Sequence, residues 1–185
     1  MDSKKYLKEI IYSETDIKKS ISSLAKWINN NYKNSKDLVI IVTMLGAVPF
    51  AMDIIKEIEV IHALDFIGVK SYFGKSKQTD IVMINKDIDI DIKNKEVIVL
   101  EDIVDSGRTL QKLLDLLNSR EPKTLQVVSL LKREVNNVEI GNLKFSIEVP
   151  QGLFLVGYGL DYNNKYRNLK DIGILKNNLL KKDDK

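Results

Sequence analysis

The fold of this chain is decided by the stretch Val97-Ile98-Val99-Leu100-Glu101-Asp102-Ile103-Val104-Asp105-Ser106-Gly107-Arg108-Thr109. Its first four residues are apolar, and a run that is apolar on both faces is typical of a strand covered on both sides. Two carboxylates and a short turn follow. Beyond them, leucines recur at the spacing of a helix with one apolar face, at Leu110, Leu113, Leu114 and Leu117. The stretch therefore predicts a buried strand, a polar turn at its carboxyl end, and a helix.

The same alternation of strand and helix continues on both sides of this stretch. Apolar runs predict further strands at Leu38–Val42, Ala63–Val69, Ile81–Ile84 and Leu125–Leu131. Helical spacing follows Ser13, with Ile17, Ile21, Leu24 and Ile28, and a second helix is predicted from Val48 to Glu57. Alternating strands and helices indicate an α/β domain with a mainly parallel sheet.

Three segments are less regular. Lys70 to Asp80 is polar and rich in small residues, which predicts a loop. Asp87 to Ile92 alternates acidic and apolar residues and is interpreted as a half-exposed strand or a turn region. Phe145 to Gly157 has strand-like composition broken by Pro150, and we expect it to form a small lobe over the end of the sheet.

The composition is that of an ordinary globular protein. The chain has 185 residues, 44% of them hydrophobic and 30% charged, a length that suits a single domain with its own core. A net charge of +3 gives little reason to propose nucleic acid or a membrane as a partner. There is no cysteine, and no apolar run approaches the roughly 20 residues of a membrane span. We therefore expect a cytoplasmic protein that binds neither nucleic acid nor membranes.

The turn between strand and helix has the composition of a phosphate site. In α/β sheets ligands bind at the carboxyl ends of strands, and a helix N-terminus there presents unpaired N–H groups and a positive dipole end. Gly107 lets the backbone approach closely, and the hydroxyls of Ser106 and Thr109 add donors, so the sequence predicts an anion cradle. Glu101 and Asp102 cannot contact a phosphate directly, and they are expected to face sugar hydroxyls or a hydrated Mg²⁺.

Asp105 lies within the turn, where a carboxylate can exchange a proton with a ligand. Helix capping is the ordinary explanation of a single Ser, Thr or Asp before a helix, and carboxylates at strand ends are usually solvated. Capping requires one such residue, whereas this segment places six polar residues around a glycine. We therefore interpret the whole run as a binding site.

The residues from Val97 to Thr109 resemble the phosphoribosyl diphosphate (PRPP) binding motif of the type I phosphoribosyltransferases, and the combination of Glu-Asp with Asp-Ser-Gly-x-Thr resembles the hypoxanthine-guanine branch. The resemblance implies a mainly parallel twisted sheet flanked by helices, with a small hood lobe formed by the two ends of the chain. It implies one domain over 1–185, with a core at about 20–140 and a hood from about 1–19 and 141–185. PRPP and phosphate binding is implied for Glu101, Asp102, Ile103, Val104, Asp105, Ser106, Gly107, Arg108 and Thr109.

A second segment resembles the purine pocket of the same branch. The likeness is carried by Phe154-Leu155-Val156-Gly157-Tyr158-Gly159-Leu160-Asp161-Tyr162 and continues in Tyr166-Arg167-Asn168-Leu169. It implies that Phe154 stacks on the purine, that the Leu155 backbone meets the base edge, that Asp161 approaches a Mg²⁺ and that Arg167 meets pyrophosphate. An aromatic face suits a flat base, and a guanidinium suits phosphate oxygens. Taken alone, the segment would be interpreted as a core phenylalanine and a surface arginine.

Two shorter segments agree with this likeness. Lys132 follows a predicted strand, and the resemblance implies that it donates to the exocyclic oxygen of a 6-oxopurine. Ser71 and Tyr72 resemble the pair in the family's mobile loop that closes over the site, where excluding water protects a reactive sugar cation. Without the resemblance, all three residues would belong to ordinary solvated segments.

The segment Thr43-Met44-Leu45-Gly46-Ala47 departs from the family pattern. The family has Leu-Lys-Gly or Leu-Arg-Gly here, in a loop that binds pyrophosphate largely through main-chain groups and often contains a non-proline cis peptide. Leu45 takes the place of the basic residue. Backbone binding by Leu45 and Gly46 is compatible with this change, but the positive side chain is missing.

Taken together, the resemblance extends from about Ile10 to Leu175 and implies a purine-salvage enzyme that transfers the phosphoribosyl group of PRPP to hypoxanthine or guanine. It implies Mg²⁺ at Glu101, Asp102 and Asp161, Asp105 as the catalytic base, and a homodimer or homotetramer. Two alternatives stay open: a xanthine-preferring enzyme of the same fold, and a non-catalytic regulator that senses PRPP or a nucleotide.

Overall fold

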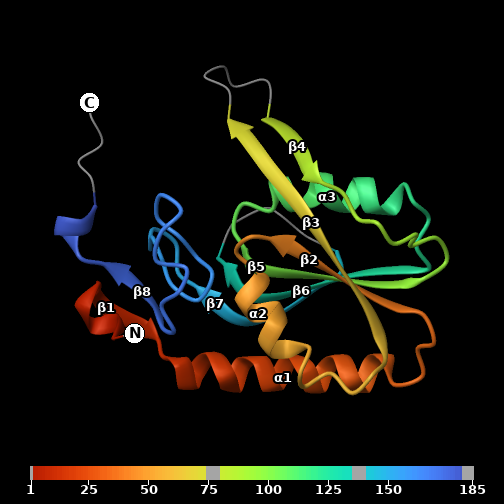
Figure 1. Cartoon of the computed structure of the whole chain (residues 1–185), viewed down its shortest axis with the longest axis horizontal. Helices are drawn as coiled ribbons and strands as arrows, with labels where there is room; N and C mark the ends of the chain where they lie inside the picture. The colour runs from red at the N-terminus through yellow and green to blue at the C-terminus, as the bar shows by residue number, and fades with distance from the viewer. Residues whose placement is uncertain (1, 74–79, 135–140, 181–185) are drawn as a thin grey trace.

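The computed structural model describes residues 2–73, 80–134 and 141–180, and of residues 70–73 and 80–82 the backbone alone. Its centre is a six-stranded sheet in the order β4-β3-β2-β5-β6-β7 (Figure 1). Neighbouring strands are parallel except for β4, which runs antiparallel to β3. The strands are β2 (Leu38–Met44), β3 (His62–Phe73), β4 (Asp80–Lys86), β5 (Glu96–Val104), β6 (Thr124–Arg133) and β7 (Leu143–Val149). The predicted mainly parallel α/β sheet is confirmed.

Helices cover both faces of this sheet (Figure 1). Helices α1 (Glu14–Tyr32) and α2 (Val48–Ile54) lie on one face and α3 (Arg108–Asn118) on the other. Ile40 and Ile98 pack with α1 and α2, whereas their neighbours Ile41 and Val99 pack with α3. Because successive residues of a strand point to opposite faces, strands covered on both sides are apolar at every position. No helix in the described part of the chain is long and apolar enough to cross a membrane.

Helix α1 starts and packs as its sequence predicts. The Ser13 hydroxyl accepts the N–H of Asp16 at 3.3 Å, and the Asp16 carboxylate accepts the N–H of Ser13 at 3.1 Å, forming a capping box. The apolar residues at helical spacing, Ile17, Ile21, Leu24 and Ile28, are all buried. This helix therefore supplies a continuous apolar stripe to the core beneath the sheet.

The two ends of the chain form a second, two-stranded sheet at the left of Figure 1. Strands β1 (Leu7–Tyr12) and β8 (Ile172–Leu175) pair antiparallel, flanked by the short 3₁₀ helices η1 (Ser3–Lys5) and η2 (Asn177–Leu179). Buried residues from both ends form a separate cluster of Leu7, Val156, Leu169 and Leu175. The predicted lobe built from the chain ends is confirmed, but Phe145 to Val149, which we expected in a lobe, belong to β7 because they pair with β6 in the main sheet.

One local prediction needs correction, and for another the structure decides between two alternatives. The predicted loop from Lys70 to Asp80 is shorter, because β3 continues to Phe73 and β4 begins at Asp80, while residues 74–79 lie outside the described part. This hairpin is held by backbone pairing, which a polar composition does not reveal. The segment from Asp87 to Ile92 is not a strand. The buried carboxylate of Asp65 accepts the N–H groups of Asp89 and Ile90 at 2.7 and 3.0 Å and folds that segment back instead.

A buried carboxylate joins the hood to the core. Asp171 precedes β8 and is buried, and its Oδ1 accepts the backbone N–H of Glu14 at 2.8 Å in the first turn of α1. A negative charge at this position also interacts favourably with the positive end of the helix dipole. The Asp171 carbonyl in turn lies so close to Gly157 that a Cβ there would overlap it. Asp171 thus connects α1 to the predicted purine segment.

We predict that Asp171→Ala lowers the free energy of unfolding by about 1–2 kcal/mol, because a buried N–H at the start of α1 loses its acceptor. Urea denaturation measures the change. Asp171→Asn is the matched control: it keeps an oxygen acceptor and should lose only the charge interaction with the helix, about 0.3–1 kcal/mol. Equal losses in the two variants would contradict this role for the hydrogen bond.

Candidate active site

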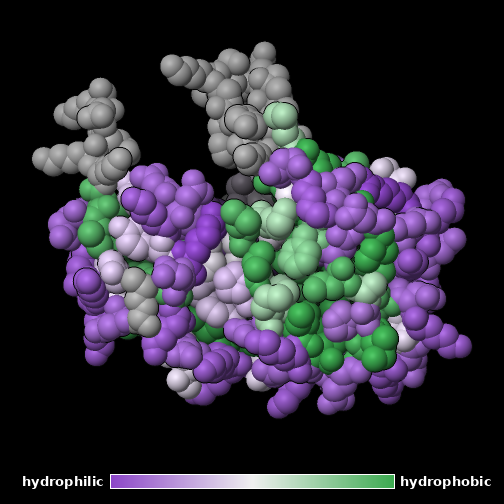
Figure 2. Space-filling model, viewed as in Figure 1, coloured by the Kyte–Doolittle hydropathy of each residue, from purple (hydrophilic) through white to green (hydrophobic). Residues whose placement is uncertain are grey.

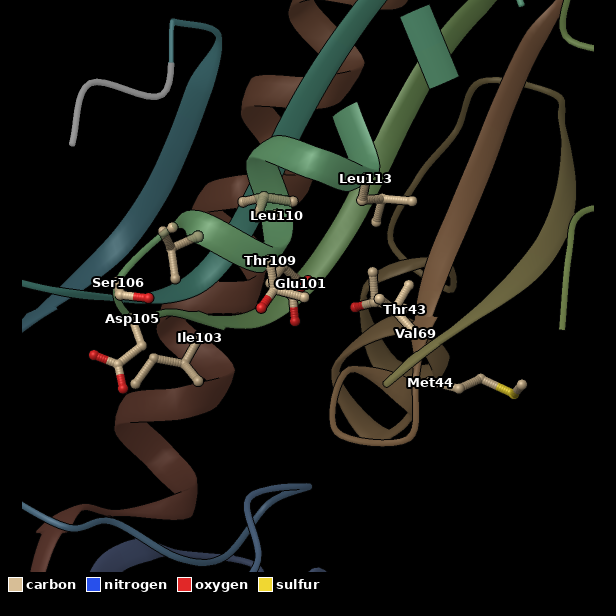
Figure 3. Close-up of a pocket in the computed structure, with 12 residues that line it drawn as sticks. Thr43, Met44, Val69, Glu101, Ile103, Asp105, Ser106, Thr109, Leu110 and Leu113 are labelled. Atoms are coloured by element: carbon tan, nitrogen blue, oxygen red, sulfur yellow. The ribbon is translucent and has the colours of Figure 1, made fainter. Parts of the chain in front are cut away.

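A cavity of about 220 Å³ opens where β2 and β5 end, beside Val69 of β3 and the start of α3 (Figure 3). Thr43 and Met44 of β2 and Val69 of β3 line one side. The predicted PRPP segment contributes Glu101, Ile103, Val104, Asp105, Ser106, Gly107 and Thr109. Asp102 and Arg108, from the same segment, do not line it. The structure therefore brings the predicted phosphate turn to the carboxyl edge of the sheet, where α/β proteins bind ligands.

Strand β5 is longer than the sequence predicted. Its apolar run ends at Leu100, but the strand continues to Val104, because Glu101, Ile103 and Val104 still pair with β6. Glu101 and Asp102 are therefore on a strand rather than in a loop. The true turn is Asp105–Gly107, where Gly107 has a φ of 71° and α3 begins at the next residue. Glycine adopts this left-handed conformation without a steric penalty.

Glu101 points into the cavity beside Thr109 (Figure 3). Burial raises the pKa of the Glu101 carboxyl well above its usual range, and the negative charge of Asp102 raises it further. A hydrogen bond with Thr43 opposes part of this shift. A bound divalent cation is what relieves repulsion between neighbouring carboxylates, so Glu101 and Asp102 fit a metal or a set of sugar hydroxyls.

The predicted pyrophosphate loop lies against Asp102. The peptide bond between Met44 and Leu45 is cis, and a Cβ at Gly46 would overlap the Asp102 carboxylate. Any other residue at this position would require the Asp102 carboxylate to move. The Leu45 side chain is 59% exposed, so the residue that departs from the family pattern is directed to solvent.

The predicted metal and pyrophosphate residues of the last third of the chain, Asp161 and Arg167, are joined to this loop through Gly159. A Cβ at Gly159 would overlap the carbonyl oxygen of Gly46, so the two segments touch through their backbones. Arg167 donates from Nη1 to the Gly159 carbonyl at 2.6 Å and forms an ion pair with Asp161 at 2.7 Å. Within the described residues, no group of three His, Cys, Asp or Glu side chains is arranged to hold a metal ion, and this includes Glu101, Asp102 and Asp161.

Of the three predicted purine residues, Phe154 is exposed, Leu155 is buried and Lys132 is partly buried. Phe154 is 56% exposed and meets Tyr162 edge-on, with ring centroids 5.9 Å apart, while Leu155 is buried. Lys132 lies on β6 opposite Val104, with its ammonium 5.0 Å from the Phe145 ring centroid and 3.8 Å from the Glu148 carboxylate. The side chains of Ser71 and Tyr72 lie outside the described residues, and their backbone belongs to β3.

Sequence analysis assigned no role to Arg133. Its Nε donates to the Asp105 carboxylate at 2.9 Å. From the sequence, only its neighbour Lys132 was predicted to have a role, in purine binding. Tyr158 was missed as well: its hydroxyl donates to Asp53 of α2 at 2.8 Å, which ties the purine segment to the helix after the pyrophosphate loop. These contacts join residues far apart in sequence, and no local spacing signals them.

Comparison with known proteins shows the family to which the chain belongs. The profile of the phosphoribosyl transferase domain matches residues 8–163. The chain belongs to this family. A hypoxanthine phosphoribosyltransferase of Escherichia coli (strain K12) is 40% identical over 174 residues, which are 91% of this chain and 96% of that protein.

Solved structures of phosphoribosyltransferases agree with the observed fold. A hypoxanthine phosphoribosyltransferase from Staphylococcus aureus has a TM-score of 0.84 at 34% identity, covering 97% of this chain and 100% of that chain. A hypoxanthine-guanine-xanthine phosphoribosyltransferase has a TM-score of 0.78 at 34% identity, covering 92% of this chain and 98% of that one. The resemblance found in the sequence, to the hypoxanthine-guanine branch, is confirmed.

The raised pKa of Glu101 makes this phosphoribosyltransferase less stable at neutral pH. A raised folded-state pKa contributes stability that is present below the ordinary value of 4.5 and is lost as the pH rises through the folded value. We predict that Glu101→Gln raises the free energy of unfolding at pH 7.5, because the amide is buried without the cost of a charge, and changes it little at pH 4.

Urea denaturation in the presence of a metal chelator measures this difference at the two pH values. Glu9→Gln, at an exposed glutamate of β1, is the matched control and should stay within about 0.5 kcal/mol of the native protein. Lower stability of Glu101→Gln than of the native protein at pH 7.5 would contradict the prediction.

Proposed function

We propose that this protein transfers the 5-phosphoribosyl group of PRPP to hypoxanthine or guanine, giving IMP or GMP and pyrophosphate in purine salvage. One observation carries the proposal. At the end of β5, the same wall of the cavity holds the Glu101 carboxylate, Asp105 as the proposed proton acceptor, and the Gly107 turn at the N-terminus of α3. Relatives named for hypoxanthine and guanine, 34–40% identical over most of the chain, support the same substrates.

The phosphate of PRPP is assigned to the turn before α3. Backbone N–H groups of the turn and the hydroxyls of Ser106 and Thr109 would donate to it, with the dipole of the helix adding favourable charge. The left-handed Gly107 opens this turn for close approach. Ile103 and Val104 continue β5 up to the turn, and Arg108 follows it as the first residue of α3.

The ribose and the leaving group are assigned to the neighbouring edge. Glu101 and Asp102 would hold the ribose hydroxyls, and bound Mg²⁺ would supply positive charge that stabilises the departing pyrophosphate. The backbone of Leu45 and Gly46 and the guanidinium of Arg167 would bind pyrophosphate oxygens. Asp161, the third residue proposed to bind metal, forms an ion pair with Arg167 at 2.7 Å. When both ligands bind, Asp161 would also contact the metal and Arg167 would also contact the pyrophosphate.

The purine is assigned to Lys132, Phe154 and Leu155, which are not among the residues that line the cavity. Phe154 offers an exposed aromatic face for stacking, and Leu155 would meet the base edge through its backbone. Lys132 would donate to the 6-oxo oxygen, which disfavours a 6-amino purine. Ser71 and Tyr72 would close over the site and exclude water.

The reaction exchanges one bond at C1 of the ribose for another. Pyrophosphate leaves with the electron pair of the C1–O bond, a ring nitrogen of the purine forms the new C1–N bond, and the N–H proton of the purine passes to Asp105. Holding both reactants in line contributes to the rate because the reacting atoms no longer have to meet by diffusion.

A second candidate is a preference for xanthine. A relative at 34% identity is named for hypoxanthine, guanine and xanthine, and the proposed Lys132 contact is shared by all three bases.

A cytoplasmic location remains a prediction from the sequence.

We also propose a homodimer or homotetramer. Partly buried apolar side chains gather on α2 and β3, where Figure 2 shows a hydrophobic area; they are Val48, Met52, Ile55, Leu64 and Phe66. Such a face is of the kind that a second copy covers.

Incubation with PRPP and MgCl₂ and each of hypoxanthine, guanine, xanthine and adenine tests the function, with turnover followed by ultraviolet absorbance. We expect turnover of 6-oxopurines and little of adenine. Asp105→Asn should lower kcat by about 10²–10⁴-fold, because an amide cannot accept the proton, and leave PRPP binding largely intact. PRPP binding without turnover of any purine would favour a regulator, and full activity of the variant would remove Asp105 from the mechanism.

Restoring a cation at position 45 should strengthen pyrophosphate binding. The exposed Leu45 leaves room for a longer side chain, and we predict that Leu45→Lys lowers the KM for pyrophosphate in the reverse reaction by about 1.5- to 5-fold, as expected for an exposed charge pair. Leu45→Gln controls for polarity and should leave this KM unchanged. Identical behaviour of the two variants would show that charge at this position does not reach the pyrophosphate.

A further inference from the structure

Arg133, the last residue of β6, joins three segments through one guanidinium. Its Nε donates to Oδ1 of Asp105 at 2.9 Å. Its Nη1 donates to the backbone carbonyls of Pro150 at 3.2 Å and Leu153 at 2.9 Å. The Arg133 side chain is only 16% exposed, whereas that of Asp105 is 64% exposed. A nearly buried, three-bonded arginine thus holds a largely exposed carboxylate.

The guanidinium is planar, so the two carbonyl contacts on Nη1 also fix the direction of the Nε–H bond. Packing does little to fix the Asp105 side chain, because most of it is in solvent. The bond from Arg133 therefore selects among its rotamers, occupying Oδ1 and leaving Oδ2 for another donor.

The same guanidinium also positions the purine segment. The Leu153 carbonyl that it binds directly precedes Phe154, whose ring we assigned to stacking. Arg133 consequently sets the position of the proton acceptor and the start of the purine segment relative to each other. A clamp on the 150–153 turn would need only the Nη1 bonds, and an ion pair to so exposed a carboxylate adds little stability.

We propose that Arg133 is a positioning residue for phosphoribosyl transfer, which aims the free oxygen of Asp105 at the purine carried on Phe154. The inference rests on the proposed function. Arg133 itself is not assigned any contact with substrate, and it acts through Asp105.

A double-mutant cycle tests the proposal in the full-length enzyme. With PRPP, Mg²⁺ and hypoxanthine, Arg133→Gln should lower kcat by about 10- to 100-fold, the effect of misplacing a catalytic group. In the Asp105→Asn background the same change should lower kcat by less than about twofold, because the group to be positioned is already disabled. Arg133→Lys should recover part of kcat, since an ammonium can bond the carboxylate but cannot hold both carbonyls as well.

Arg120→Gln is the matched control. Arg120 follows α3 and also pairs with an aspartate, Asp87, at 2.7 Å, so its loss removes an equivalent ion pair away from the cavity. Its kcat should equal that of the native enzyme. The KM for PRPP and the midpoint of thermal unfolding are measured for every variant, and if Arg133→Gln unfolds early, Arg133→Lys takes its place in the cycle.

The outcomes separate this inference from the proposed function. Native turnover together with an unchanged kcat in the Arg133 variants overturns the inference alone. Losses that multiply fully in the double variant also overturn it, because they would show Arg133 acting independently of Asp105. Absence of turnover by the native enzyme overturns the proposed function and this inference with it.

Discussion

The parallel pairing of β2 with β5 is the constraint on which the rest of the site depends. The two strands stay in register to Val42 and Leu100, and the next residues are Thr43 and Glu101. Sliding β5 back along β2 would carry the Glu101 carboxylate further into the sheet, where burying an unpaired charge costs several kcal/mol. The polar residues at the strand ends therefore oppose any change of register, while the apolar runs behind them supply the burial that drives pairing.

That register brings the Met44–Gly46 loop into contact with Asp102 of β5 and with the purine segment. The Met44–Gly46 loop lies against Asp102, and Gly159 of the purine segment lies against Gly46. A Cβ at Gly159 would overlap the backbone of Gly46, so this contact requires glycine, whereas a Cβ at Gly46 would require the Asp102 side chain to move. Since Arg167 bonds the Gly159 carbonyl, and Asp171 anchors the same segment to α1, the hood and the core meet at the proposed pyrophosphate site.

Elements that follow from local pattern could be predicted from the sequence, and contacts between distant segments could not. Burial on one face imposes the helical spacing of apolar residues in α1 and α3. Burial on both faces imposes the continuous apolar run before Glu101. The end of β5 could not be placed, because pairing with β6 extends it through polar residues. The family motif identified the predicted site residues, and the cavity gathers many of those between Glu101 and Thr109. Arg133 escaped notice because its partners, Asp105 and the Leu153 carbonyl, are near only after folding.

The distribution of charge around the cavity shows what the site has to balance. Asp105 and Asp161 are each held by an arginine, whereas Glu101 is disfavoured as an anion by its own burial and by Asp102. A protein selected for stability alone would replace such a carboxylate, so its presence fits a site that keeps a cation-binding group at a cost in stability. Leu45 also changes the charge of the site, because it takes the place of a lysine or arginine. Attraction for an anionic leaving group then has to come from backbone N–H groups, Arg167 and bound metal. Binding of that kind depends on the geometry of the loop rather than on the reach of a side chain, which makes the close contact between Gly46 and Gly159 central to it.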